Sequence, residues 1–373
     1  MYLRNLKPLL CLLLLISFSA GAQSLKNPIT VTAYYSGGPQ QVDSFDVQPI
    51  THIIYSFCHL KGNRLNVDDA KDSLTIQRLV GLKSKKPDLK VLLSLGGWGG
   101  CAPCSDVFAS KQGRKEFAQS VKELSDYFKT DGLDLDWEYP AIEGHPGHKY
   151  QPADKKNFTS LVDILRKTLG AEAEISFAAG GFPKFLEESI EWKKVMKKAT
   201  RVNLMTYDLV HGYSTQTGHH TPLYSTPQQK ESTDNAVQYL INLGIPANQL
   251  VIGAAFYGRT WEGVQNVNNG LYQPGKFKSF DPYKGFEAKL SPQDGFQYFW
   301  DEVAQAPYMY HPGRQLFTTF DNERSIKLKT EYAIDKGLNG IMFWELTLDK
   351  SKDGLLNVID QTIKQKAGTA QTN

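Results

Sequence analysis

The chain has 373 residues, of which 41% are hydrophobic and 22% charged, and its formal net charge is +3. This composition is typical of a folded globular protein and excludes a largely disordered chain. A charge so close to neutral gives no electrostatic reason to bind nucleic acid or an anionic membrane surface, so we expect neither as a partner.

Residues 1–22 have the pattern of a secretory signal peptide. Arg4 and Lys7 precede an apolar run, and Ala20-Gly21-Ala22 supplies the small residues of a cleavage site. The run is too short to anchor the chain in a membrane. Removal of residues 1–22 takes away two cations and no acid, which lowers the formal charge from +3 to +1. We expect the remaining residues 23–373 to be secreted or periplasmic.

Short β-rich segments alternate with helical patterns along the rest of the chain. The predicted strands are 30–35, 52–57, 90–95, 132–138, 174–179, 201–207, 250–256 and 340–344. Amphipathic segments between them, with apolar residues at three- and four-residue spacing, predict helices at 113–128, 155–169, 234–243 and 324–336.

Eight strands separated by helices or long loops indicate parallel pairing, and eight is the number that closes a (β/α)8 TIM barrel. A doubly wound open sheet is the alternative, but no GxGxxG follows the first strand. Residues 261–320, between strands 7 and 8, are rich in Tyr, Phe, Gly and Pro and are too many for one crossover helix. They predict a small α+β insertion domain within the barrel of residues 23–373.

Three cysteines remain after removal of the signal peptide: Cys58, Cys101 and Cys104. The CAPC run is compatible with a redox pair, half of a metal site or a local disulfide. The chain contains no second CxxC and no nearby His pair, which argues against zinc. In an exported protein we favour a Cys101–Cys104 disulfide and a buried, free Cys58. We expect neither a metal nor another cofactor.

The most informative segment is DGLDLDWEYP, at residues 131–140. Because side chains alternate along a strand, Asp134, Asp136 and Glu138 project from one face, and the apolar Leu and Trp residues between them project from the other. In a barrel the apolar face packs on the outer helices. The acidic face opens at the carboxyl end of the strand, where barrel enzymes place their active sites.

Three acids on one face are not a packing solution, because buried unpaired carboxylates are costly and repel one another. A solvated edge is contradicted by the apolar alternation, and a metal site would need further ligands at matched spacing, which the sequence lacks. The remaining interpretation is a proton-sharing carboxylate array in which one member stays protonated near neutral pH and acts as general acid.

Residues 131–140 resemble the DxxDxDxE motif of glycoside hydrolase family 18, the chitinases and their relatives. Further segments resemble other family motifs in order: SLGG at 94–97, MTYD at 205–208, LVIGAAFYGR at 250–259 and GIMFW at 340–344. The predicted insertion also lies where many family chitinases carry one. The resemblance covers nearly the whole mature chain.

The resemblance implies a substrate-assisted retaining mechanism. Glu138 would protonate the glycosidic oxygen while the substrate's own N-acetyl carbonyl attacks the anomeric carbon. Asp136 would hold the acetamide N–H, and Asp134 behind it would adjust the shared proton. Tyr207 would bind the acetamide oxygen. These four residues are the predicted catalytic set.

The resemblance also implies a set of substrate-binding residues. Asp208 would position the sugar, Trp344 would form the floor beneath it, and Arg259 would contact sugar hydroxyls. Tyr34, Phe57, Met205 and Trp98 complete the predicted substrate-binding set.

Other residues near the predicted site have different expected roles. Ser94 is predicted to hydrogen-bond Asp134, and Tyr213 and Trp261, with Trp98, are candidate sugar platforms. His145 and His148 are interpreted as surface residues.

Three functions agree with these features. The first is a chitinase that cleaves β-1,4-linked N-acetylglucosamine polymers, with chitin or N-acetylglucosamine oligosaccharides as partner and a monomeric state. The second is an endo-β-N-acetylglucosaminidase acting on the chitobiose core of N-glycans. The third is a non-catalytic lectin, which the presence of Glu138, Asp136 and Tyr207 disfavours. The insertion favours the chitinase, since family members that cleave glycans commonly lack it.

Overall fold

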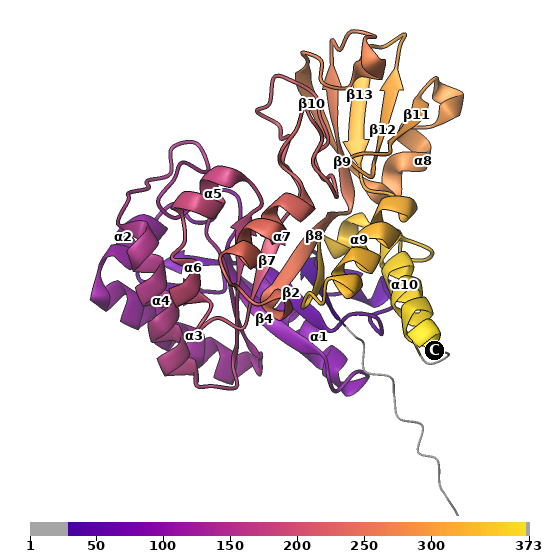
Figure 1. Cartoon of the computed structure of the whole chain (residues 1–373). Coiled ribbons are helices and arrows are strands. Elements are labelled where there is room, and N and C mark those ends of the chain that lie inside the picture. Colours follow the sequence, from indigo (N-terminus) through magenta and orange to yellow (C-terminus); the bar gives the residue numbers. More distant parts are fainter. Residues whose placement is uncertain (1–28, 371–373) are drawn as a thin grey trace, which may run out of the picture.

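A computed structural model describes residues 29–370 of the chain, so the predicted signal peptide lies outside the described residues. Eight parallel strands close into a barrel in the order β1-β2-β4-β5-β6-β7-β8-β14, because β14 pairs with both β8 and β1. The predicted (β/α)8 barrel is confirmed, and helices surround it (Figure 1).

The barrel strands are β1 (Thr30–Tyr35), β2 (His52–Lys61), β4 (Lys90–Gly96), β5 (Gly132–Asp136), β6 (Glu174–Gly180), β7 (Arg201–Met205), β8 (Leu250–Ala255) and β14 (Gly340–Trp344). The short strand β3 (Arg64–Asn66) extends β2 as a hairpin. The helices of the barrel are α1 (Ala70–Gly81), α2 (Cys104–Ala109), α3 (Lys111–Phe128), α4 (Asp154–Leu169), α5 (Pro183–Glu188), α6 (Trp192–Val195), α7 (Thr233–Asn242), α9 (Glu323–Asp335) and α10 (Leu355–Ala370).

Capping side chains set where two predicted helices begin. The Ser110 hydroxyl accepts a hydrogen bond from the Gly113 backbone N–H, so α3 starts before residue 113. At α9, Asn322 and Ser325 form a reciprocal capping box. Each cap supplies a partner to an N–H group that the first turn of a helix leaves unpaired.

Two barrel strands end two residues earlier than predicted. The strands predicted at 132–138 and 201–207 end instead at Asp136 and Met205, where their ladders to β4 and β6 stop. Glu138 and Tyr207 therefore stand on the loops that follow the strands, at the carboxyl end of the barrel.

A second sheet follows β8 and stands beyond the barrel at the end of that strand (Figure 1). Its antiparallel order is β10-β9-β13-β12-β11. The strands are β9 (Tyr257–Glu262), β10 (Lys276–Pro282), β11 (Gln297–Asp301), β12 (Ala306–His311) and β13 (Leu316–Phe320), and a short helix α8 (Phe286–Lys289) lies between β10 and β11.

Trp261, predicted as a candidate sugar platform, is fully buried in this second sheet, so that prediction is wrong. Its ring packs against Phe277 and Phe317, and its Nε1–H donates to the Ser214 carbonyl at 2.9 Å. The sequence placed this tryptophan on a loop, whereas the antiparallel partners of β9 cover it.

Cys101 and Cys104 form a disulfide and Cys58 is a buried free thiol, as predicted. The disulfide lies at the start of α2, in the loop that follows β4. Within residues 29–370, none of the helices combines the length and apolarity needed to cross a membrane.

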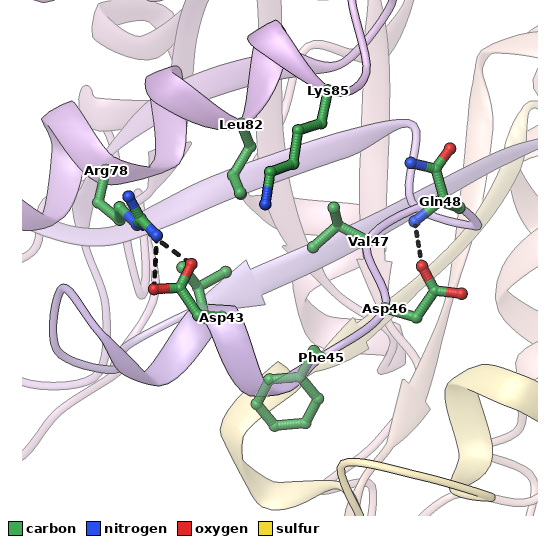
Figure 2. Close-up of a pocket in the computed structure, with 9 residues that line it drawn as sticks. Asp43, Phe45, Asp46, Val47, Gln48, Arg78, Leu82 and Lys85 are labelled. Carbon is green, nitrogen blue, oxygen red and sulfur yellow. Dashed lines mark hydrogen bonds and ion pairs between the residues drawn. The ribbon is translucent and has the colours of Figure 1, made fainter.

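A hollow on the outer wall of the barrel lies between η1 (Gln41–Ser44) and the C-terminal half of α1 (Figure 2). Asp43 and Arg78 pair across it at 2.7 Å. It contains none of the residues that the sequence places in a site, and we assign it no function.

Candidate active site

Three carboxyl groups rise through the carboxyl half of the barrel. Asp134 and Asp136 project from β5, with Asp134 fully buried and Asp136 only 4% exposed. Glu138, just beyond the end of the strand, is partly exposed. The acids predicted from the two-residue period therefore form a column that leads from the interior to the mouth.

Asp134 is held by four hydrogen-bond donors from four other strands. Ser94 and Tyr34 donate to its Oδ2 at 2.8 and 3.2 Å, and Ser176 and Asn203 donate to its Oδ1 at 2.6 and 3.2 Å. An ionised carboxylate is an acceptor only, so four donors favour its charged form. Burial raises the pKa of Asp134, and the donors oppose that rise.

The Ser94 bond was predicted from the sequence, whereas Ser176 and Asn203 were missed. Both occupy inward-facing positions in the middle of predicted strands, between apolar neighbours. A polar residue in the middle of a barrel strand, on its inner face, is the signal that points to them. Tyr34, predicted to shape the substrate pocket, lies beneath Asp134 as one of its donors.

Asp136 is the least satisfied member of the column. Its Oδ1 is buried without a hydrogen-bond partner. Burial raises the pKa of Asp136 well above its usual value, and the neighbouring charges of Glu138 and Asp134 add to the rise. The carboxylate can therefore accept a proton or an N–H group supplied from outside.

Glu138 has the properties of a general acid. Burial raises its pKa to about 7, a hydrogen bond from Tyr139 opposes the rise, and the negative charge of Asp208 adds to it. At neutral pH a substantial fraction of Glu138 keeps its proton. A carboxyl group that is protonated near the working pH can donate that proton in a reaction.

Two glycines at the end of β4 let neighbouring elements approach the column closely. Gly96 has φ +113°, and a Cβ there would lie 2.2 Å from the Asp136 carbonyl oxygen. At Gly97, with φ +80°, a Cβ would lie 2.3 Å from the Phe57 ring, and its N–H donates to the Asp136 carbonyl at 2.9 Å. Any side chain at these positions would displace Phe57 or the backbone of Asp136.

Asp208 and Arg259 form a bidentate ion pair. Arg259 Nε and Nη2 each donate to one Asp208 oxygen at 2.5 Å, and His220 Nδ1 lies 3.5 Å from Oδ1. The Arg259 guanidinium also lies 5.5 Å from the ring centres of Tyr257 and Phe277. Burial alone would raise the pKa of Asp208, but Arg259 and His220 hold it well below its usual range.

This pair joins the two sheets of the molecule, since Arg259 belongs to β9 and Asp208 follows β7. Arg259 was predicted to contact sugar hydroxyls. In the structure its guanidinium donates two hydrogen bonds to Asp208. His220, fully buried beside Asp208, was missed by the sequence analysis.

Tyr207 lies next to the column in a largely apolar setting. Its hydroxyl is 3.8 Å from Met342 Sδ, and its ring meets Tyr257 edge-on. Burial raises the pKa of Tyr207 well above its usual value, and Asp136 and Glu138 raise it further. The phenol therefore stays protonated and is available as a donor. The buried Met205 belongs to the same apolar cluster.

Trp344 contacts both Phe57 and the buried Tyr34. The rings of Trp344 and Phe57 are stacked with centres 5.6 Å apart, and Tyr34 is tilted against Trp344 at 5.8 Å. Trp344, the predicted floor of the site, is thus held between two aromatic rings. Three peptide bonds in this region are cis: Ser56–Phe57, Glu138–Tyr139 and Trp344–Glu345.

Exposed aromatic rings continue outward from the column. Trp98 is 48% exposed and Tyr213 64% exposed, with ring centres 6.3 Å apart. Tyr139, beside the general acid, lies 6.4 Å from Trp98. His145, interpreted from the sequence as an ordinary surface residue, packs edge-on against Trp98 at 5.4 Å.

A carboxylic acid with a raised pKa above buried carboxylates, at the carboxyl end of a barrel, defines a site for acid-catalysed bond cleavage. The model of Glycosyl hydrolases family 18 matches residues 30–349, and the chain belongs to this family. It is a glycoside hydrolase.

Similar proteins include the Niallia circulans protein Chitinase A1, 34% identical over 301 residues, which cover 74% of this chain and 43% of that protein. Mouse Chitotriosidase-1 is 31% identical over 84% of this chain and 70% of its own length. A solved family 18 N-acetylglucosaminidase from Paenibacillus barengoltzii superposes with a TM-score of 0.82 at 34% identity, covering 90% of this chain and 99% of that one.

Proposed function

We propose that the protein is a secreted chitinase that hydrolyses β-1,4 linkages between N-acetylglucosamine units by substrate-assisted, retaining catalysis. The observation that carries the proposal is the pairing of Glu138, with its raised pKa, and Asp136, with a buried oxygen that lacks a donor. A substrate with an acetamide N–H next to the scissile bond supplies that donor. The resemblance of the chain to chitinases supports the same substrate class.

Glu138 donates its proton to the glycosidic oxygen as the bond from the anomeric carbon to that oxygen breaks. The carbonyl oxygen of the substrate's acetamido group forms the new bond to the anomeric carbon and gives a cyclic oxazolinium ion. Asp136 accepts the acetamide N–H and stabilises the developing positive charge. Water, deprotonated by Glu138, then attacks the anomeric carbon and opens the ring with net retention.

Asp134 supports this step from below. Its four donors hold it in place, so the proton shared in the column stays with Asp136 and Glu138. Tyr207 donates to the acetamide oxygen, and Asp208, fixed by Arg259, accepts from the sugar. Trp344 lies under the ring. Trp98 and Tyr213 provide stacking surface for further units of the chain.

A second candidate is an N-acetylglucosaminidase that releases single sugar units. It is favoured by the 34% identity to the Paenibacillus barengoltzii enzyme, which this chain covers over 99% of its length. Both candidates use the same chemistry and differ in how many sugar units bind on each side of the cleaved bond.

The test is a product profile on N-acetylglucosamine oligomers of two to six units, beside chitosan lacking acetyl groups and a high-mannose glycopeptide. A chitinase releases mainly disaccharides and longer fragments, whereas an N-acetylglucosaminidase releases monomers from every oligomer. If the enzyme releases the glycan from the glycopeptide but does not cleave the N-acetylglucosamine oligomers, its substrate is the N-glycan. Proton NMR of early products should show the β-anomer, and an initial α-anomer would exclude the retaining mechanism.

Export and oligomeric state have separate tests. The proposal expects the mature chain to begin near Gln23 in the periplasm or medium, which N-terminal sequencing of the natively produced protein measures. It also expects a monomer in sedimentation experiments.

A further inference from the structure

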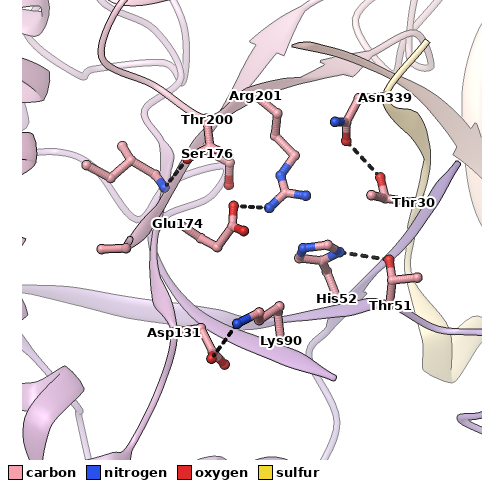
Figure 3. A network of polar contacts seen from close by, with 12 residues as sticks. Thr30, Thr51, His52, Lys90, Asp131, Glu174, Ser176, Thr200, Arg201 and Asn339 are labelled. Carbon is pink, nitrogen blue, oxygen red and sulfur yellow. Dashed lines mark hydrogen bonds and ion pairs between the residues drawn. The ribbon is translucent and has the colours of Figure 1, made fainter. Parts of the chain in front are cut away.

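The barrel is polar and charged at the amino ends of its strands, the end away from Glu138 (Figure 3). Barrel interiors are usually filled by branched apolar side chains. Here the first residues of four strands bring charged or titratable groups to the barrel floor: His52, Lys90, Glu174 and Arg201. An uncharged contact completes the ring, since Thr30 donates to Asn339 at 2.9 Å.

Arg201 is the deeply buried cation of this group, at 3% exposure. Its Nη2 donates to a carboxylate oxygen of Glu174 on the neighbouring strand. Glu174 is more exposed than its partner. Solvent therefore screens the negative end of the pair more than the positive end, and a net positive potential remains inside the barrel.

The register of the sheet places Arg201 in the same row as Asp134, with β6 between them. Ser176 on β6 pairs with Asp134 on one side and with Arg201 on the other. The backbones of Arg201 and Asp134 are therefore two strand spacings apart, about 10 Å across the sheet. Asp134 and Asp136 above are buried carboxylates, and charges in a protein interior need compensation.

The other charged and titratable groups near Arg201 compensate less. His52 is buried, and burial lowers its pKa well below the usual value, with the charges of Arg201 and Lys90 lowering it further, so it is neutral. Lys90 is 46% exposed and lies 3.4 Å from Asp131, which also binds Lys83. Asp134 itself is faced by Tyr34 from β1, Ser94 from β4, Ser176 from β6, Asn203 from β7 and Asp136 on its own strand. Asp136 is faced in addition by Glu138 and Tyr207.

We propose that Arg201 is a positioning residue of the active site, whose buried charge opposes protonation of the Asp134–Asp136 pair. The proposal rests on the proposed function, because it assumes that Asp136 must be charged to hold the acetamide. Arg201 touches no substrate and acts through the barrel interior. Burial raises the pKa of Asp134 and lowers that of Arg201, and each of the two charges opposes the shift of the other.

Two substitutions that should shift the acid limb of kcat/KM in opposite directions test the effect of the Arg201 charge. Removing Arg201 in Arg201→Met lets the pair bind protons more readily, so the acid limb of kcat/KM moves to higher pH. A unit charge about 10 Å away moves a pKa by about one unit at an effective dielectric constant of about 20. Glu174→Gln keeps the shape but removes the opposing charge, so the acid limb moves to lower pH. A merely structural role would lower activity in both variants without moving the limb in opposite directions.

Two controls keep the test decisive. Lys90→Met removes a solvent-exposed cation from the same end of the barrel and should move the acid limb much less than Arg201→Met does, because solvent screens its charge. If Arg201→Met does not fold, the double variant Arg201→Met/Glu174→Met removes both charges and should still move the limb upward, by less. Equal or absent shifts in Arg201→Met and Glu174→Gln would overturn the proposal.

A readout without turnover separates this proposal from the proposed function. Carbon NMR of protein labelled at aspartate carboxyl groups, with Asp134 assigned through Asp134→Asn, measures the titration of the pair directly. The expected result is a higher titration point in Arg201→Met and a lower one in Glu174→Gln. If wild-type enzyme fails to cleave N-acetylglucosamine oligomers while these shifts occur, the proposed function is wrong, and the effect of Arg201 on the protonation of the pair stands. Unchanged titration in an active enzyme would refute the role of Arg201 alone.

Discussion

Replacing Asp208 by Asn should narrow the pH range of activity from the alkaline side. Asp208 carries a negative charge near Glu138, and that charge raises the pKa of the acid. The amide has nearly the same shape but no charge. It also leaves the Arg259 guanidinium without its counter-ion, and an uncompensated cation favours ionised Glu138. Both effects lower the pKa of Glu138.

The magnitude follows from the shift of Glu138 from an ordinary 4.5 to about 7. Burial is the largest cause of this shift, and it persists in the variant because the surrounding elements are unchanged. Asp208 therefore contributes less to the rise than burial does. With the unpaired Arg259 acting in the same direction, we expect the alkaline limb to fall by about one pH unit.

The assay is kcat/KM on a soluble chitotetraose from about pH 4 to about pH 10, a range that brackets the pKa of Glu138. Asp208→Asn will also bind sugar less well, but that loss lowers the whole curve without moving its limbs. The matched variant Arg259→Met leaves Asp208 charged, with only His220 as its partner, so the alkaline limb should move to higher pH. If both variants keep the alkaline limb of the wild type, Asp208 does not control the proton of Glu138.

Three further substitutions test other parts of the structure. Glu138→Gln should keep the fold and sugar binding but lower kcat by about two to four orders of magnitude, and retention of a tenth of the activity would reassign the acid. Lys329→Met leaves the buried Asp321 carboxylate without its ammonium partner, now 2.7 Å away, and should destabilise folding by about 3–5 kcal/mol in urea titrations. An unchanged midpoint would refute that cost. Trp98→Ala should raise KM for hexamers more than for dimers, and equal effects would place the ring outside the binding path.

Much of this molecule follows from local pattern. Period-two alternation in residues 131–140 predicts that Asp134, Asp136 and Glu138 share one side, and the structure places them in one column. Apolar runs separated by helical periodicity predict eight strands, and eight strands close the barrel. These features depend on the sequence alone because side-chain direction along a strand is set by backbone geometry.

Local pattern does not reveal which elements cover a residue. Trp261 follows a predicted strand much as Trp98 does, yet Trp261 is buried by the second sheet and Trp98 is exposed. The difference arises from antiparallel pairing of β9 with β10 and β13, whose partners are distant in the chain. The ends of β5 and β7 were misplaced for a related reason, because a strand stops where its neighbours stop pairing.

The sequence by itself thus determined the barrel, the order of its elements and the acids that line β5. Only the tertiary structure decided what surrounds those acids: Ser176 and Asn203 reach Asp134 from strands 42 and 69 residues away, and Arg259 reaches Asp208 from the second sheet. The same closure of the barrel brings Arg201 to its floor. The physical reason is that protonation depends on charges and donors near in space, and barrel closure makes neighbours of residues that are remote in sequence.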